Sequence, residues 1–174
     1  RVDPEDVRRA LTPRTILVDA GDCIQGTPLS YVHAMGEGPA APAGRPDPQM
    51  ACMNAMGYDA FVIGNHEYDF GLDVLRKAQA EAAFPWRAAN TLQAAPAGAV
   101  AYQSYLVKEI DGVRVGILGL TTPATQGFVD ASSTAGLSFE DPLETARRMV
   151  PIMRERERCD AVVVVCHMGL EEDE

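Results

Sequence analysis

The stretch FVIGNHEYDFG, residues 61–71, decides how the rest of this chain is interpreted. An apolar run that begins at Ala60 ends abruptly at Gly64, which predicts a short buried strand followed by a tight turn. Asn65 and His66 then follow at the carboxyl end of that strand, where open α/β sheets bind their ligands. An amide oxygen and an imidazole both bind metals, and an imidazole also donates protons. Taken alone, the pattern equally fits a strand, a polar turn and a capped helix.

Two other apolar runs end in polar side chains of the same kind. Residues 15–20 form a run that ends in Gly21-Asp22. Residues 160–166, with four consecutive valines, form a run that ends in His167. The valine run predicts a central strand that is buried on both faces of its sheet. Three separate strands therefore carry potential ligands at their carboxyl ends.

Four side chains from these strand ends are candidates for one site: Asp22, Asn65, His66 and His167. We expect them to meet because parallel strands of one sheet end at the same edge. A carboxylate can bridge two metal ions, and two metals about 3.5–4 Å apart clamp the attacking and leaving oxygens of a displacement at phosphorus. The donor types suit Zn, Mn, Fe or Ni better than Ca. The alternative is that Asp22 caps a helix, Asn65 forms a turn and His167 is a core histidine.

The remaining sequence predicts one domain with a mixed α/β sandwich architecture. Asp-Pro pairs predict helix starts, because Asp caps free N–H groups and Pro suits the first helical position; the pairs are Asp3-Pro4, Asp47-Pro48 and Asp141-Pro142. A helix is expected over residues 71–83, and a β-hairpin with an Asp-Gly turn over residues 102–120. Residues 91–99 are expected to form a loop and residues 121–136 to be irregular, and Pro151 is expected to kink or split the last helix.

Composition and charge exclude several classes of function. The 174 residues are 47% hydrophobic and 23% charged, which is typical of a soluble globular protein. No apolar run approaches the roughly 20 residues that span a bilayer. The net charge of −10, without a stripe of Lys and Arg, argues against a nucleic-acid polymer as partner. It does not exclude a small phosphorylated substrate, because bound divalent cations reverse the local field. The spacing of the four cysteines favours free buried thiols.

The strand-end motifs and their flanking sequences match a known pattern. The motifs are Gly21-Asp22, GNHE at residues 64–67 and His167, and the flanking sequences are LVDAGDCIQGTPL (17–29), GILGLTTP (116–123) and VVCHMGL (164–170). Together they resemble the calcineurin-like metallophosphoesterase superfamily, and within it the 5′-nucleotidase and 2′,3′-cyclic-nucleotide 2′-phosphodiesterase family. The resemblance implies the N-terminal catalytic domain of that family, with an α/β/β/α sandwich and mixed sheets. It also implies a hydrolase that cleaves nucleotide phosphoesters by in-line attack of a metal-bound hydroxide.

The resemblance also implies a role for each candidate residue. Asp22 would bridge two divalent metals, and Asn65 and His167 would bind the second of them. His66 would be an unligated catalytic residue that stabilises the developing charge and assists the leaving group. Glu67 would be a turn residue or would support the ligands. The implied partner is a small nucleotide, and the implied location is the periplasm, the cell surface or the outside of the cell.

Two family motifs have no counterpart in residues 1–174. An Asp-x-His motif before Gly21 and a Gly-His-x-His motif after His167 are both missing, as is the family's C-terminal nucleotide-binding domain. We therefore expect residues 1–174 to be a partial, incomplete metallophosphoesterase domain from a longer protein, with weak or no metal binding and no useful catalysis alone. Three alternatives stay open: a thiosulfohydrolase, whose pattern differs at Asn65-His66, a catalytically inactive binding module that retains the fold, and a mononuclear metal-binding domain.

Overall fold

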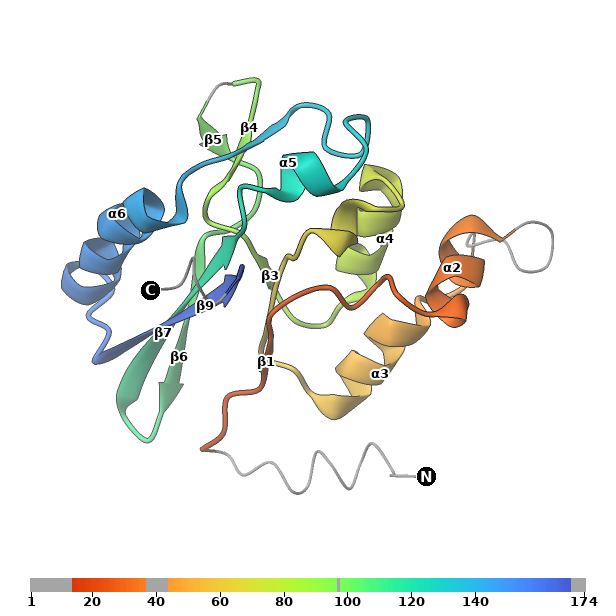
Figure 1. Cartoon of the computed structure of the whole chain (residues 1–174). Helices are drawn as coiled ribbons and strands as arrows, with labels where there is room; N and C mark the ends of the chain where they lie inside the picture. Colours follow the sequence, from red (N-terminus) through yellow and green to blue (C-terminus); the bar gives the residue numbers. More distant parts are fainter. Residues whose placement is uncertain (1–13, 37–43, 97, 170–174) are drawn as a thin grey trace.

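Two stacked β-sheets with helices on both outer sides form the body of the molecule (Figure 1). This computed structural model describes residues 14–36, 44–96 and 98–169. The helix predicted at Asp3-Pro4 lies outside these residues. The mixed α/β sandwich that the sequence predicts is confirmed, and its layers follow the α/β/β/α order that the family resemblance implies.

The first sheet contains three parallel strands in the order β1-β2-β3. They are β1 (Val18–Asp19), β2 (Ala60–Val62) and β3 (Trp86–Arg87). Helices α3 (Pro48–Met56) and α4 (Leu72–Glu81) lie beside this sheet, and α2 (Pro28–Met35) packs on α3. The core between them contains the fully buried side chains of Met50, Met53, Phe61 and Leu75. Met50 and Met53, which lie three residues apart on α3, are therefore core side chains, as this helical spacing indicates.

The second sheet has the strand order β6-β7-β9 and mixes both pairing directions. Strands β6 (Tyr105–Ile110) and β7 (Val113–Thr121) form the predicted hairpin, whereas β7 and β9 (Ala161–His167) are parallel. Helix α6 (Pro142–Glu155) covers the outer face of this sheet, where Met153 is fully buried. The two sheets approach closely at Gly119, where a Cβ would lie 2.7 Å from the Cβ of Arg87. A residue without a side chain at this position allows the sheets to pack this closely.

Helix caps and turns agree with the local sequence signals. Asp47 accepts hydrogen bonds from the backbone N–H groups of Gln49 and Met50, at 2.8 and 3.0 Å. Asp141 accepts one from the N–H of Glu144 at 2.9 Å. The helix starts predicted at residues 47–48 and 141–142 are therefore confirmed.

Strand β9 is not the central, doubly buried strand that its valines predict. Within the described residues it pairs with β7 alone, and Val163 and Val164 are 46% and 40% exposed. A run of β-branched residues favours the extended conformation but does not determine whether a strand is central or at an edge. The prediction of burial on both faces is therefore wrong for this part of the chain.

Other local predictions are also corrected. Helix α6 continues through Pro151, which lies on its exposed side, so this proline does not split the helix. Residues 91–99 are not all loop, because β4 (Thr91–Gln93) pairs with β5 (Ala99–Val100) and with β8 (Leu137–Phe139) in a third sheet. Residues 121–136 include the short helix α5 (Thr125–Phe128).

The cysteines and the helices provide two further observations. No disulfide is formed by the four cysteines, which are Cys23, Cys52, Cys159 and Cys166. Cys52 is exposed, which corrects the expectation that all four thiols are buried. Within residues 14–36, 44–96 and 98–169, no helix has both the length and the apolar character that a membrane crossing requires.

The buried amide of Asn90 joins β7 to the segment that follows β8. It donates to the carbonyl oxygens of Thr121 (2.7 Å) and Glu140 (3.0 Å) and accepts from the N–H of Thr121 (2.9 Å). Asn90→Ala is expected to lower the free energy of unfolding by about 2 kcal/mol, because buried backbone groups lose their partners. Urea unfolding checks this value. The exposed control Gln126→Ala should change it by no more than about 0.5 kcal/mol, and an equally small change in Asn90→Ala would refute the role.

Candidate metal centre

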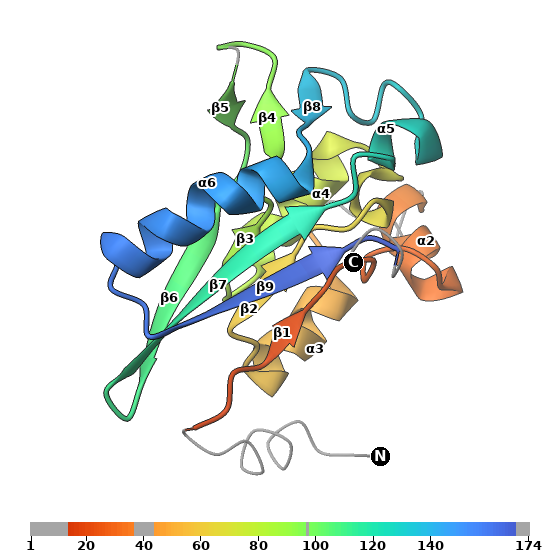
Figure 2. The same ribbon diagram turned by 60° about the vertical axis from the view of Figure 1, so that its left-hand side comes forward.

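The carboxyl ends of β1, β2 and β9 meet at one end of the sandwich. Figure 2 shows β9 ending beside the segment that leaves β1. Strands β1 and β2 belong to the first sheet and β9 to the second, so the prediction that all three lie in one sheet is wrong. They converge instead across the interface between the two sheets, where β2 contacts β9.

The imidazole of His167 connects the three strand ends. Its Nδ1 lies 2.7 Å from the carbonyl oxygen of Ala20, which only accepts, so Nδ1 carries the hydrogen. Its Nε2 lies 3.1 Å from Oδ1 of Asn65 and 3.2 Å from Oδ2 of Asp22. In the neutral ring, the Nε2 lone pair therefore faces two oxygen acceptors. A second proton or a cation between these atoms would stabilise the arrangement.

The loops that carry these side chains approach each other closely at two glycines. A Cβ on Gly21 would lie 2.5 Å from the backbone nitrogen of Gly64. A Cβ on Gly64 would collide with Oδ1 of Asp22 and lie 2.8 Å from Cε1 of His167. Gly21 and Asp22 have φ values of +106° and +65°, and the second is unusual for a residue with a side chain. Glycine is therefore required where the loops touch.

His66 is linked to the cluster through its backbone, and its ring is held by a residue that the sequence analysis missed. Its N–H donates to Oδ1 of Asp22 at 2.9 Å. Its Nδ1 lies 2.7 Å from Oδ2 of Asp69, and this hydrogen bond raises the pKa of His66 although partial burial opposes the rise. The ring is 44% exposed. The i, i+3 spacing of His66 and Asp69 was the available signal, because residues 66–68 form the 3₁₀ turn η2 (His66–Tyr68).

The donor atoms of Asp22, Asn65 and His167 fit a divalent metal. Ligands bound tetrahedrally at about 2.0 Å lie about 3.3 Å apart, close to the 3.1 and 3.2 Å found here. His167 also donates its other ring N–H to a backbone carbonyl, as metal-binding histidines usually do. Within the described part of the chain, no three His, Cys, Asp or Glu side chains form a metal-binding group. Asp22 and His167 are two side chains of these types, and the amide oxygen of Asn65 is the third donor atom beside them.

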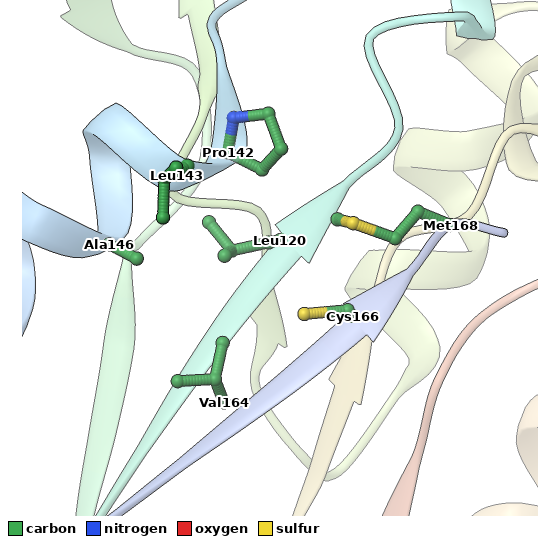
Figure 3. A pocket seen from close by; sticks show the side chains of 7 residues that line it. All are labelled: Leu120, Pro142, Leu143, Ala146, Val164, Cys166 and Met168. Atoms are coloured by element: carbon green, nitrogen blue, oxygen red, sulfur yellow. The ribbon is translucent and has the colours of Figure 1, made fainter. Parts of the chain in front are cut away.

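Two pockets lie near the end of β9, and they differ in chemistry. One, of about 370 Å³, is lined by Asn65, Thr122, Phe128 and His167 together with residues 166–169. The other is an apolar groove of about 390 Å³ between α6 and β9 (Figure 3). Its lining residues are Leu120, Pro142, Leu143, Ala146, Val164, Cys166 and Met168. The groove offers no carboxylate, amide or imidazole side chain, so the pocket with Asn65 and His167 is the candidate site.

Comparisons with known proteins identify similar sequences and structures, although no family model matches this chain. The chain is 36% identical to a 2′,3′-cyclic-nucleotide 2′-phosphodiesterase/3′-nucleotidase of Yersinia enterocolitica, over 97% of this chain and 26% of the relative. It is 32% identical to a 5′-nucleotidase of Vibrio vulnificus, over 91% of this chain and 26% of the relative. The chain therefore spans about a quarter of the length of these curated relatives.

A solved structure of similar fold agrees with these sequence matches. The calcineurin-like phosphoesterase YfkN from Bacillus subtilis superimposes with a TM-score of 0.77 and is 27% identical. The match covers 95% of this chain and 52% of that chain.

Proposed function

From its membership of the calcineurin-like phosphoesterase superfamily, we propose that this chain forms part of the catalytic domain of a metal-dependent hydrolase of nucleotide phosphoesters. The observation that supports this most strongly is the cluster around His167. Its Nε2 faces one carboxylate and one amide oxygen that come from two other strand ends. Such a cluster of lone pairs is suited to a divalent cation, and a cation held there could bind a phosphate group in the pocket that Asn65 and His167 line.

Each side chain of the cluster has a distinct role in the proposed reaction. Asp22, Asn65 and His167 would hold a divalent metal, with Asp22 supplying the negative charge. A bound metal supplies Lewis-acid polarisation of the phosphate and lowers the pKa of water toward about 7. Asp69 fixes the ring of His66 by accepting from Nδ1, which leaves Nε2 to transfer a proton at the leaving-group oxygen. The partly exposed ring is accessible to a substrate.

The number of metals and the source of the remaining ligands are further parts of the proposal. Three donors are about half of what two metals need, and the chain spans 26% of each curated relative described above. We propose that segments outside residues 1–174 complete a site for two divalent ions, of Zn, Mn, Fe or Ni. Residues 1–174 alone would then bind metal weakly. By family resemblance, the full-length protein would act in the periplasm, at the cell surface or outside the cell.

Hydrolysis assays on the full-length protein test the proposal. AMP, 3′-AMP and 2′,3′-cyclic AMP are supplied separately, with Mn or Zn added and bound metal measured in the same sample. Turnover of at least one nucleotide is expected. Absence of turnover on all three, with metal confirmed in the protein, would favour the inactive binding module instead.

A charge-removing variant tests the metal ligand that carries the negative charge. Asp22→Asn keeps the size of the side chain but loses the carboxylate, so Mn affinity should fall by about 100-fold or more. Metal analysis after dialysis against a chelator measures the loss. Asp73→Asn, on the exposed side of α4, is the matched control and should keep its metal. Normal metal content in Asp22→Asn would remove this residue from the ligand set.

A further inference from the structure

Glu67 is a fully buried carboxylate that the proposed reaction does not use. It lies in η2, directly after the two candidate residues Asn65 and His66. A buried carboxylate is costly unless hydrogen bonds satisfy its oxygens. The donors that satisfy Glu67 are therefore informative about its purpose.

Those donors are backbone N–H groups from both ligand-bearing loops. Oε2 accepts from the N–H of Asp22 at 2.8 Å and from that of Gly64 at 2.7 Å. Oε1 accepts from the N–H of Cys23 at 2.7 Å and, more weakly, from that of Ile24 at 3.4 Å. A single oxygen of Glu67 thus connects the loop that follows β1 to the loop that follows β2.

The loop after β1 has a conformation that needs such support. Gly21 and Asp22 both have positive φ, and a non-glycine residue persists in this region only when its surroundings hold it there. The N–H of Asp22 donates a hydrogen bond to Glu67, and the side chain of Asp22 accepts one from the N–H of His66. Both contacts come from the segment 64–67, so the backbone of Asp22 is positioned by the loop that carries Asn65.

We propose that Glu67 is a positioning residue of the metal centre, which holds the loop of Asp22 against the loop of Asn65 so that their oxygens face Nε2 of His167. This inference rests on the proposed function, because it concerns the same centre. Glu67 touches neither the metal nor the substrate. Its effect on binding passes through the backbone of Asp22 and Gly64.

The isosteric variant Glu67→Gln separates this role from simple space filling. The glutamine keeps the shape of the side chain, but one end becomes an NH₂ group that faces backbone N–H donors instead of accepting from them. One of the two loops must then shift. Residues that orient metal ligands typically contribute 10–100-fold to metal affinity, so Mn affinity should fall by at least about 10-fold.

The experiment measures Mn affinity of the full-length protein by chelator competition, with near-UV circular dichroism to establish the folded fraction. Glu81→Gln is the matched control, because Glu81 also accepts a backbone N–H, from Asp47, but is joined to α3 and not to the ligand loops. Weaker Mn binding in folded Glu67→Gln alone, with kcat restored at high Mn concentration, supports the inference. Added Mn should not restore kcat in His66→Ala.

The contradicting outcomes are distinct from one another. Wild-type affinity in Glu67→Gln would overturn the positioning role and leave the proposed function standing. Failure of the wild-type protein to bind Mn would overturn the proposed function, and this inference with it. If Glu67→Gln does not fold, Glu67→Asp decides by the same measurement, because it keeps the charge but loses reach. Failure of both variants to fold would assign Glu67 to folding alone and overturn the inference.

Discussion

Replacing His66 with alanine in the full-length protein is expected to lower kcat by about 10²–10⁴-fold, the usual contribution of a general acid or base. The amount of bound metal should not change, because the ring of His66 is hydrogen-bonded to Asp69 and is not among the three clustered donors. The backbone N–H of His66, which donates to Asp22, is retained in the variant. Steady-state kinetics on the preferred nucleotide and metal analysis of the same preparation check both parts.

Two related variants define the role of His66 more closely. Asp69→Asn should lower kcat by a smaller factor, because the ring stays but loses the carboxylate that orients it. His33→Ala is the control: His33 lies buried in α2 near Lys77 and Asp47, so its loss should affect stability and leave kcat unchanged. Loss of metal from His66→Ala would show that His66 is itself a ligand, contrary to the role proposed for it.

Gly64→Ala is expected to abolish metal binding and to destabilise the fold by about 3 kcal/mol, the upper end of the usual cost of overpacking. The added Cβ would collide with the carboxylate of Asp22 and come within 2.8 Å of the ring of His167. Neither neighbour can move without breaking the cluster. The ring of His167 is hydrogen-bonded to the carbonyl oxygen of Ala20, and the carboxylate of Asp22 accepts a hydrogen bond from the N–H of His66. Metal analysis and urea unfolding measure the two effects.

A second glycine provides the matched control for this substitution. Gly127, in α5, has no positive φ and no atom within 4 Å of an added Cβ. Gly127→Ala should therefore leave metal binding unchanged and alter the free energy of unfolding by at most about 1 kcal/mol. Equal behaviour of the two alanine variants would mean that the close approach of the loops at Gly64 is not needed for the site.

The sequence predicted correctly that Asp22, Asn65 and His167 converge, whereas His66 joins them through its backbone N–H. The reason for the success is local. Each of the three apolar runs stops at a residue with a polar side chain, and strand polarity places these residues at carboxyl ends. Side-chain oxygens of Asp22 and Asn65 do lie within 3.2 Å of Nε2 of His167. Their metal-binding role, and that of His66 in catalysis, stays a prediction.

The sequence could not predict how the strands are distributed between sheets. Strand β9 pairs with β7 and lies across from β2, an arrangement that depends on long-range pairing and not on the residues of β9. The valine run fits an edge strand as well as a central one. The same reasoning applies to Asn90 and Glu67, whose partners lie 31 and 45 positions away in the chain, at Thr121 and Asp22.

The most direct test of the account is a crystal structure of the full-length protein grown with Mn, with the metal located by its anomalous scattering. We expect a Mn ion within about 2.0–2.3 Å of Nε2 of His167 and of side-chain oxygens of Asp22 and Asn65. His66 should lie beside the ion without binding it. A Mn ion bound elsewhere, with these three side chains turned away from it, would contradict the account.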